Sequence, residues 1–79
     1  MEVTWNYRII VRQDDDEEDF SIYEVYYEDD KIIAWTRDRV GISGNSIEEL
    51  REVYKRFGRA FDKPILRSSF VNGKEILND

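Results

Sequence analysis

The fold is decided by residues 46–61, SIEELREVYKRFGRAF, where the spacing of the apolar side chains changes. In this stretch they lie three or four residues apart, at Ile47, Leu50, Tyr54, Phe57 and Phe61. Earlier in the chain they alternate, as at positions 5, 7, 9 and 11. A helix repeats its faces every three to four residues and a strand every second residue, so the chain is predicted to form strands first and then one amphipathic helix.

The predicted helix has signals at both ends. Ser46 followed by Glu49 has the form of a capping box, which satisfies the first free amide groups of a helix. Gly58 weakens the helix, and Pro64 ends it because the residue before a proline avoids helical geometry. We therefore expect a helix that begins at Ser46 and loosens from Gly58 onward.

The first half of the chain is predicted to form strands at residues 2–12, 20–28 and 31–37. A turn at Asp29-Asp30 places Tyr27 opposite Ile32 and Val25 opposite Ala34. A matching register for the first hairpin is obtained by pairing Arg12 with Phe20, Arg8 with Glu24, Ile10 with Ile22 and Trp5 with Tyr27. Because one register keeps one face uncharged through both hairpins, it favours a three-stranded antiparallel meander.

The expected fold class is therefore α+β, with the order β-β-β-α in a single domain over residues 1–66. Residues 67–79 contain Asn72-Gly73 between two short apolar pairs, which is a hairpin signal. Because these flanks are short, the sequence leaves open whether this region is a tail or a short hairpin.

The charge of the chain is concentrated in one place. The net charge is -6, and one unbroken acidic run contains six residues: Asp14, Asp15, Asp16, Glu17, Glu18 and Asp19. Without these six, the 18 acidic residues fall to 12, which equals the 12 lysines and arginines. We predict that this run is a solvated acidic loop, because like charges repel when they are packed together.

The composition offers little for catalysis. The chain has no histidine and no cysteine, which removes the commonest general base and the thiol nucleophile. Glu24 could act as an acid or base if it were buried beside Trp35, but an ion pair with Arg8 across the strands is the ordinary interpretation. We therefore predict a protein that is not an enzyme and that has no cofactor.

The acidic run does not match the pattern of a calcium-binding loop. An EF-hand loop needs glycine at its sixth position and glutamate at its twelfth. Counted from Asp14, these positions hold Asp19 and Val25, so the pattern fails. We do not expect a dedicated metal site.

Nucleic acid and membranes are not expected partners either. Arg51, Lys55 and Arg59 share one face of the predicted helix, but Glu48 and Glu52 lie beside them and the acidic run would repel a polyanion. The N-terminal residues lack the basic and apolar regions of a signal peptide, and no apolar stretch approaches about 20 residues. We expect a soluble, cytoplasmic protein.

Several segments occur in an order that resembles a group of short uncharacterised bacterial proteins. They are Trp5-Asn6-Tyr7-Arg8-Ile9, Tyr23-Glu24-Val25-Tyr26-Tyr27, Ser46-Ile47-Glu48-Glu49-Leu50 and Pro64-Ile65-Leu66. The resemblance implies a compact bacterial or mobile-element protein and carries no activity, cofactor or active site with it.

The predicted meander has a second side that one helix cannot cover. We call it the outer sheet face; its residues are Arg8, Ile10, Ile22, Glu24, Tyr26, Ile33, Trp35 and Arg37. An apolar patch with an aromatic centre and a polar rim is typical of a partner-binding surface. The alternative is that the segment from Pro64 to Leu77 folds back and covers it.

Two functional hypotheses follow. The first is a non-enzymatic interaction module that binds a protein partner, or a second copy as a homodimer, through the outer sheet face. The second is an acidic inhibitor of the mobile-element type, which acts on a nucleic-acid enzyme because the run from Asp14 to Asp19 imitates phosphates.

Overall fold

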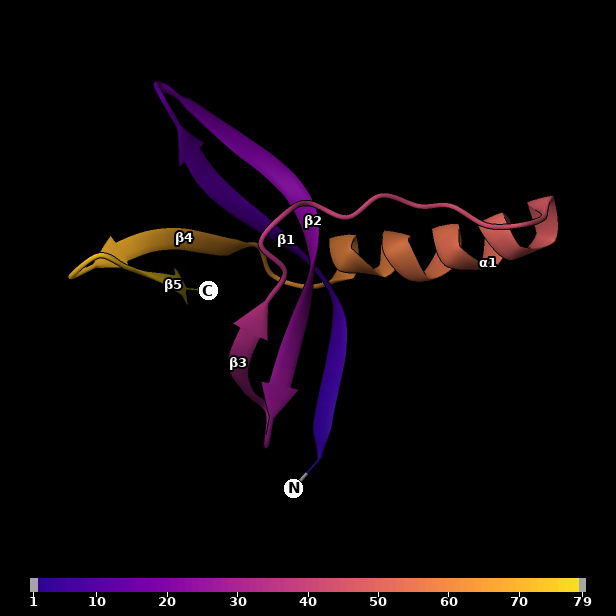
Figure 1. Ribbon diagram of the computed structural model, residues 1–79, viewed down its shortest axis with the longest axis horizontal. Coiled ribbons are helices and arrows are strands. Elements are labelled where there is room, and N and C mark those ends of the chain that lie inside the picture. Colours follow the sequence, from indigo (N-terminus) through magenta and orange to yellow (C-terminus); the bar gives the residue numbers. More distant parts are fainter. Residues whose placement is uncertain (1, 79) are drawn as a thin grey trace.

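The computed structural model describes residues 2–78, apart from the side chain of Asp14, and shows an α+β fold (Figure 1). The strands are β1 (Val3–Asp14), β2 (Glu17–Glu28), β3 (Lys31–Trp35), β4 (Leu66–Val71) and β5 (Lys74–Asn78). The helix α1 (Ile47–Gly58) continues into a short 3-10 helix, η1 (Arg59–Asp62). The strands form one mixed sheet in the order β3-β2-β1-β4-β5.

The predicted three-stranded meander followed by a helix is therefore wrong, although the α+β class holds. A meander leaves one edge of β1 without a partner, and the chain uses part of that edge after the helix. Leu66 and Arg67 pair in parallel with Ile10 and Val11, and Leu66 becomes almost fully buried. β4 and β5 then form an antiparallel hairpin around the Asn72-Gly73 turn, in which both residues have positive φ angles.

The acidic run is not a loop, which corrects a second prediction. β1 continues to Asp14 and β2 begins at Glu17, so that a two-residue turn, Asp15-Asp16, joins the strands. This turn shifts the expected pairing by one residue. Trp5 now lies opposite Tyr26, Arg8 opposite Tyr23 and Ile10 opposite Ser21. Successive side chains of a strand point to opposite faces of the sheet. A shift of one residue in the pairing therefore changes which side chains of β1 and β2 share a face.

The second hairpin follows its predicted register only near the turn. Tyr27 pairs with Ile32 and Glu28 with Lys31, as expected. An irregularity between Tyr26 and Tyr27 then changes the register, so that Val25 pairs with Trp35 instead of Ala34. The shift places Trp35 on the same side of the sheet as Val25.

The main buried cluster lies on one side of this curved sheet, while Ile9 and Val11 of β1 are buried on the other side. The buried members of the cluster are Ile10, Tyr23, Val25 and Leu66, and partly buried Tyr27, Ile32, Trp35 and Leu77 pack against them. β3 and β5 are at opposite edges of the strand order, yet the indole nitrogen of Trp35 donates a hydrogen bond of 2.9 Å to Glu75. The sheet therefore curls until its two edges meet over the core.

Most of the helix stands away from the sheet, which corrects the expected packing of Ile47, Leu50 and Tyr54 against it, whereas Phe57 at its base meets Tyr7 of β1. No residue of α1 is buried, and the helix points outward on the side opposite the β4–β5 hairpin (Figure 1). The segment between β3 and α1 runs back along the helix; a side chain at Gly44 would come within 2.8 Å of the amide nitrogen of Leu50. Because β4 and β5 cover the main buried cluster, that side of the sheet does not need the helix as a cover.

The predicted helix ends are confirmed. The side chain of Ser46 accepts a hydrogen bond of 3.1 Å from the amide of Glu49, which caps the first turn. The α-helix ends at Gly58 and η1 ends just before Lys63, whose extended backbone precedes Pro64. These signals are local, so they do not depend on what the helix packs against.

Candidate functional site

The eight residues predicted for the outer sheet face do not share one surface. Ile10 is in the core, Trp35 packs against that core, and Leu66 and Leu77 of the C-terminal hairpin cover this side. Ile22, Glu24 and Tyr26 lie opposite Ile9, Tyr7 and Trp5, on the side from which the helix projects. Arg8 is buried, Ile33 is half-exposed beside the irregularity in β2–β3, and Arg37 follows the end of β3.

The predicted ion pair between Arg8 and Glu24 does not form, because the two side chains lie on opposite sides of the sheet. The guanidinium of Arg8 donates to the hydroxyl of Tyr27 at 2.7 Å and to the carbonyl of Pro64 at 2.9 Å. The carboxylate of Glu24 accepts a hydrogen bond of 2.5 Å from the hydroxyl of Tyr26. This bond raises the pKa of Tyr26, because a phenolate would lose it and would lie beside a carboxylate.

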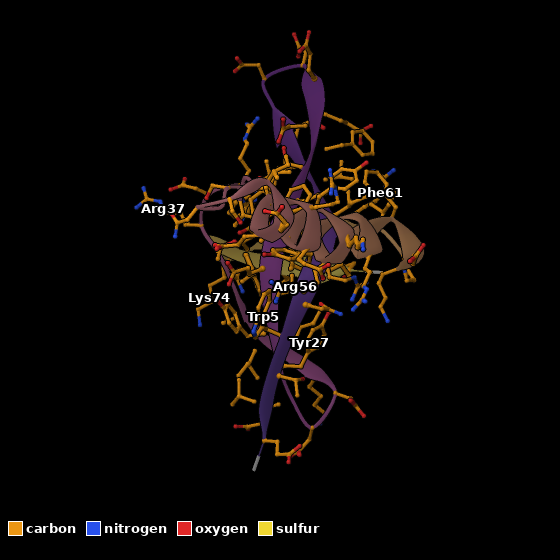
Figure 2. The ribbon with its side chains drawn as sticks, turned by 90° about the vertical axis from the view of Figure 1, so that its right-hand side faces the viewer. Trp5, Tyr27, Arg37, Arg56, Phe61 and Lys74 are labelled. Carbon is orange, nitrogen blue, oxygen red and sulfur yellow. The ribbon has the colours of Figure 1, made fainter. Side chains whose placement is uncertain are left out.

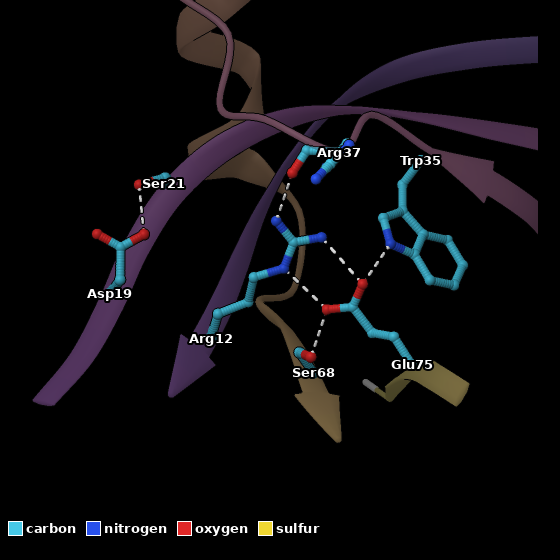
Figure 3. A network of polar contacts seen from close by, with 7 residues as sticks. All are labelled: Arg12, Asp19, Ser21, Trp35, Arg37, Ser68 and Glu75. Carbon is cyan, nitrogen blue, oxygen red and sulfur yellow. Dashed lines mark hydrogen bonds and ion pairs between the residues drawn. The ribbon is translucent and has the colours of Figure 1, made fainter. Parts of the chain in front are cut away.

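Closure of the core depends on a polar network around Glu75 (Figure 3). Its carboxylate accepts two hydrogen bonds from Arg12, at 2.8 and 3.0 Å, and others from Trp35 and Ser68. The hydrogen bonds from Arg12 are the main reason that the pKa of Glu75 is lowered to about 2. Arg12 also donates to the carbonyl of Arg37 and stacks on the ring of Tyr23. These bonds connect β1, β3, β4 and β5, so we interpret the network as structural.

A groove lies where the base of the helix meets β1 and β2. We call it the helix groove; it encloses about 480 Å³, and its apolar lining consists of Ile9, Phe20, Ile22, Val40, Phe57, Phe61 and Ile65. Ile9, Phe20 and Ile22 share one side of the first hairpin, and Phe57 and Phe61 lie at the base of the helix, which explains why they converge. Phe61 and Phe20 remain largely exposed, at 71% and 54%. Ser21 and Arg39 give the groove a polar margin.

An aromatic ladder fixes the base of the helix on the sheet. The ring of Trp5 meets that of Tyr7 edge to face at 5.1 Å, and Tyr7 meets Phe57 at 5.3 Å. Edge-to-face aromatic pairs are more favourable than the burial of their apolar surface alone would make them. Here they determine where α1 leaves the sheet. Ala60, fully buried just beyond the helix, supports the same junction.

A second cleft lies on the other side of the helix. We call it the basic cleft; it encloses about 460 Å³ and is lined by Trp5, Asn6, Tyr7, Arg56, Arg59 and Lys63. Figure 2 shows Phe61 on the side of the helix that faces the β1–β2 turn, and Arg56 and Trp5 on the opposite side. The helix therefore separates an apolar groove from a basic, aromatic one.

The six acidic residues occupy different environments. Glu18 forms an ion pair with Arg67 at 2.8 Å, and Asp19 accepts a hydrogen bond from Ser21 and lies 3.5 Å from Arg39. Asp15, Asp16 and Glu17 are exposed at the turn. The side chain of Asp14 lies outside the described residues. Across the described part of the chain, no three carboxylates converge as ligands for a metal ion.

Sequence reasoning missed the helix groove. In the sequence, Ile9 belongs to the alternating apolar positions of the first strand, Phe20 begins the second predicted strand, and Ile65 follows the proline that ends the helix. The helical spacing of Phe57 and Phe61 was visible, but it shows only that one face is apolar and does not show what covers that face.

No protein-family model, curated protein or solved structure matches the chain. Over residues 2–78, no helix has the length and apolar character that crossing a membrane requires.

Proposed function

We propose that the protein is a non-enzymatic interaction module that pairs with a second copy of itself through the helix groove. The observation that supports this proposal is the position of α1, which presents Leu50, Val53 and Phe57 without burying any of them fully. An amphipathic helix is normally stabilised by burial of its apolar face. A second copy would supply that burial.

The chain exposes more surface area than a compact monomer of its mass, which supports the proposal that a partner covers part of it. A compact monomer of 9.5 kDa exposes about 5,000 Å². This chain exposes 6210 Å². The difference of about 1,200 Å² is larger than the roughly 800 Å² that each partner buries in an interface of standard size.

The shape of the molecule permits a symmetric arrangement. The helix projects from the middle of the long β1–β2 hairpin, and the helix groove is the corner on one side of it. A two-fold axis across both elements would set two α1 helices antiparallel, each in the groove of the other copy. Such an isologous contact uses the same surface twice and closes as a dimer.

Phe61 gives the sharpest test, because the chain contains a matched control. Phe61 and Phe70 are exposed to nearly the same extent, 71% and 70%, but Phe70 lies in β4, outside the helix groove. We expect sedimentation velocity to show a dimer that dissociates on dilution, that is lost in Phe61→Arg and that is kept in Phe70→Arg. A parent chain that stays monomeric at high concentration would contradict self-pairing, as would equal effects of the two substitutions.

The acidic-inhibitor alternative has weaker support. Imitation of a phosphate backbone needs a row of free carboxylates, whereas Glu18 and Asp19 interact with Arg67 and Arg39. Asp15, Asp16 and Glu17 remain at the turn. Neutralising these three residues should leave self-pairing unchanged, and a loss of pairing would count against the proposed groove.

A further inference from the structure

β1 has an open edge beside the basic cleft. Its other edge pairs with β2 along its whole length, but β4 pairs with it only at Ile10 and Val11. In the described part of the chain, no strand pairs with the remaining edge from Val3 to Tyr7. The segment before β4 leaves this edge at Pro64, which has no amide hydrogen to continue the ladder.

The side chains next to this open edge are basic and aromatic. Arg56, Arg59 and Lys63 line the basic cleft, and none of them forms an ion pair within the described residues. Trp5, which also lines the cleft, is 47% exposed. Glu24 faces the same side of the sheet, but its carboxylate accepts the hydrogen bond from Tyr26.

We propose that the edge from Val3 to Tyr7 binds an extended acidic peptide of a partner protein as an added strand. The peptide would continue the line of β4 along β1 and would exchange backbone hydrogen bonds with it, as in β-augmentation. Five residues of strand span about 16 Å, so a short segment is sufficient. Alternate acidic side chains would point toward Arg56, Arg59 and Lys63, and alternate apolar ones toward the opposite side.

The acidic β1–β2 turn lies too far away to repel an acidic peptide at this edge. Asp15, in the turn that follows β1, lies eight residues beyond Tyr7, which corresponds to about 26 Å along the strand direction. Exposed charges are screened over about 8 Å at physiological ionic strength. An open strand edge also favours a peptide over nucleic acid, because the free amide and carbonyl groups match a peptide backbone.

The test uses three synthetic peptides and isothermal titration with the full chain. The first alternates glutamate and valine, the second replaces each glutamate by lysine, and the third places proline at a central valine. We expect the first to bind, and the other two to bind at least tenfold more weakly. Amide hydrogen exchange from Val3 to Tyr7 should slow when the first peptide is bound.

Protein variants identify the site. Arg59→Glu and Arg56→Glu should each lower the affinity for the glutamate peptide about three- to tenfold. Each substitution removes an exposed ion pair and replaces it by repulsion. Arg51→Glu is the control, because Arg51 is on the helix but outside the basic cleft. Circular dichroism confirms that each variant folds, and either basic-cleft variant alone is sufficient for the comparison.

Several results would overturn the proposal. The lysine or proline peptide could bind as tightly as the glutamate peptide, or Arg51→Glu could weaken binding as much as the basic-cleft variants do. Amide hydrogen exchange from Val3 to Tyr7 could also stay unchanged when the glutamate peptide is added. Binding of a single-stranded oligonucleotide in place of the acidic peptide would assign the basic cleft to nucleic acid instead. None of these outcomes depends on the dimer, because Phe61→Arg can be titrated in the same way.

Discussion

Glu75 is the residue on which closure of the sheet depends, because its carboxylate accepts hydrogen bonds from side chains of three other strands. Arg12 and Glu75 are both mostly shielded from solvent, with side chains 23% and 19% exposed. Removing one partner of a shielded, charged hydrogen bond costs about 1.5–3 kcal/mol. Loss of the Glu75 carboxylate would therefore leave the shielded guanidinium of Arg12 without its main partner and would destabilise its present position.

The pKa of Glu75 predicts how stability depends on pH. It falls from an ordinary value of 4.5 to about 2 in the folded protein, so the unfolded chain binds the proton more readily. The stabilisation is present in full above pH 4.5 and is lost as the pH falls toward 2. In urea melts, Glu75→Gln should lower the free energy of unfolding at pH 7 and have little effect near pH 2. Glu17→Gln, at the exposed turn, should have little effect at either pH; a pH-independent effect of Glu75→Gln would contradict the assignment.

At the residue scale, the sequence predicted local features and missed the partners of charged residues. The cap at Ser46 and the loosening at Gly58 could be predicted, because each depends on a few neighbouring residues. The partners of Arg8 and Arg12 could not, since both depend on a register set by the position of a turn inside six acidic residues. Repulsion suggested a loop there, whereas strand geometry turns successive carboxylates to opposite faces.

At the scale of elements, the sheet and not the helix carries the core. Ile10 is fully buried in β1, whereas Leu50 in α1 is only partly buried. Ile10→Ala should therefore cost about 2–5 kcal/mol of unfolding free energy through cavity formation. Leu50→Ala should cost clearly less. Chemical denaturation at low protein concentration, where dimers are absent, makes the comparison; a larger cost at Leu50 would mean that the helix packs on the core.

The C-terminal hairpin explains why the sequence misjudged the helix. Asn72-Gly73 signalled a turn, but its short flanks gave no indication that Leu66 would reach Ile10. A parallel contact between residues 56 positions apart leaves no local pattern in the chain. Without β4 and β5, a helix was the natural cover for one side of the sheet, and the other side became a candidate partner surface.

At the scale of the whole molecule, the chain is extended for its length. It measures 44 × 38 × 20 Å and has a radius of gyration of 13.8 Å, against about 12 Å for a compact chain of this size. The helix and the β4–β5 hairpin lie at opposite ends of the long dimension (Figure 1). This shape creates both the helix groove and the basic cleft, so the two proposed contacts arise from a single feature.

The central claim is that α1 depends on a second copy for its burial, and amide hydrogen exchange at two protein concentrations tests it most directly. At low concentration the account predicts strong protection in the paired regions of β1 and β2, and rapid exchange throughout α1 from Ile47 to Gly58. At high concentration α1 should become protected in the parent chain and in Phe70→Arg, but not in Phe61→Arg. Protection of α1 equal to that of β1 in the dilute monomer would contradict the account, because the helix would then already be packed on its own sheet.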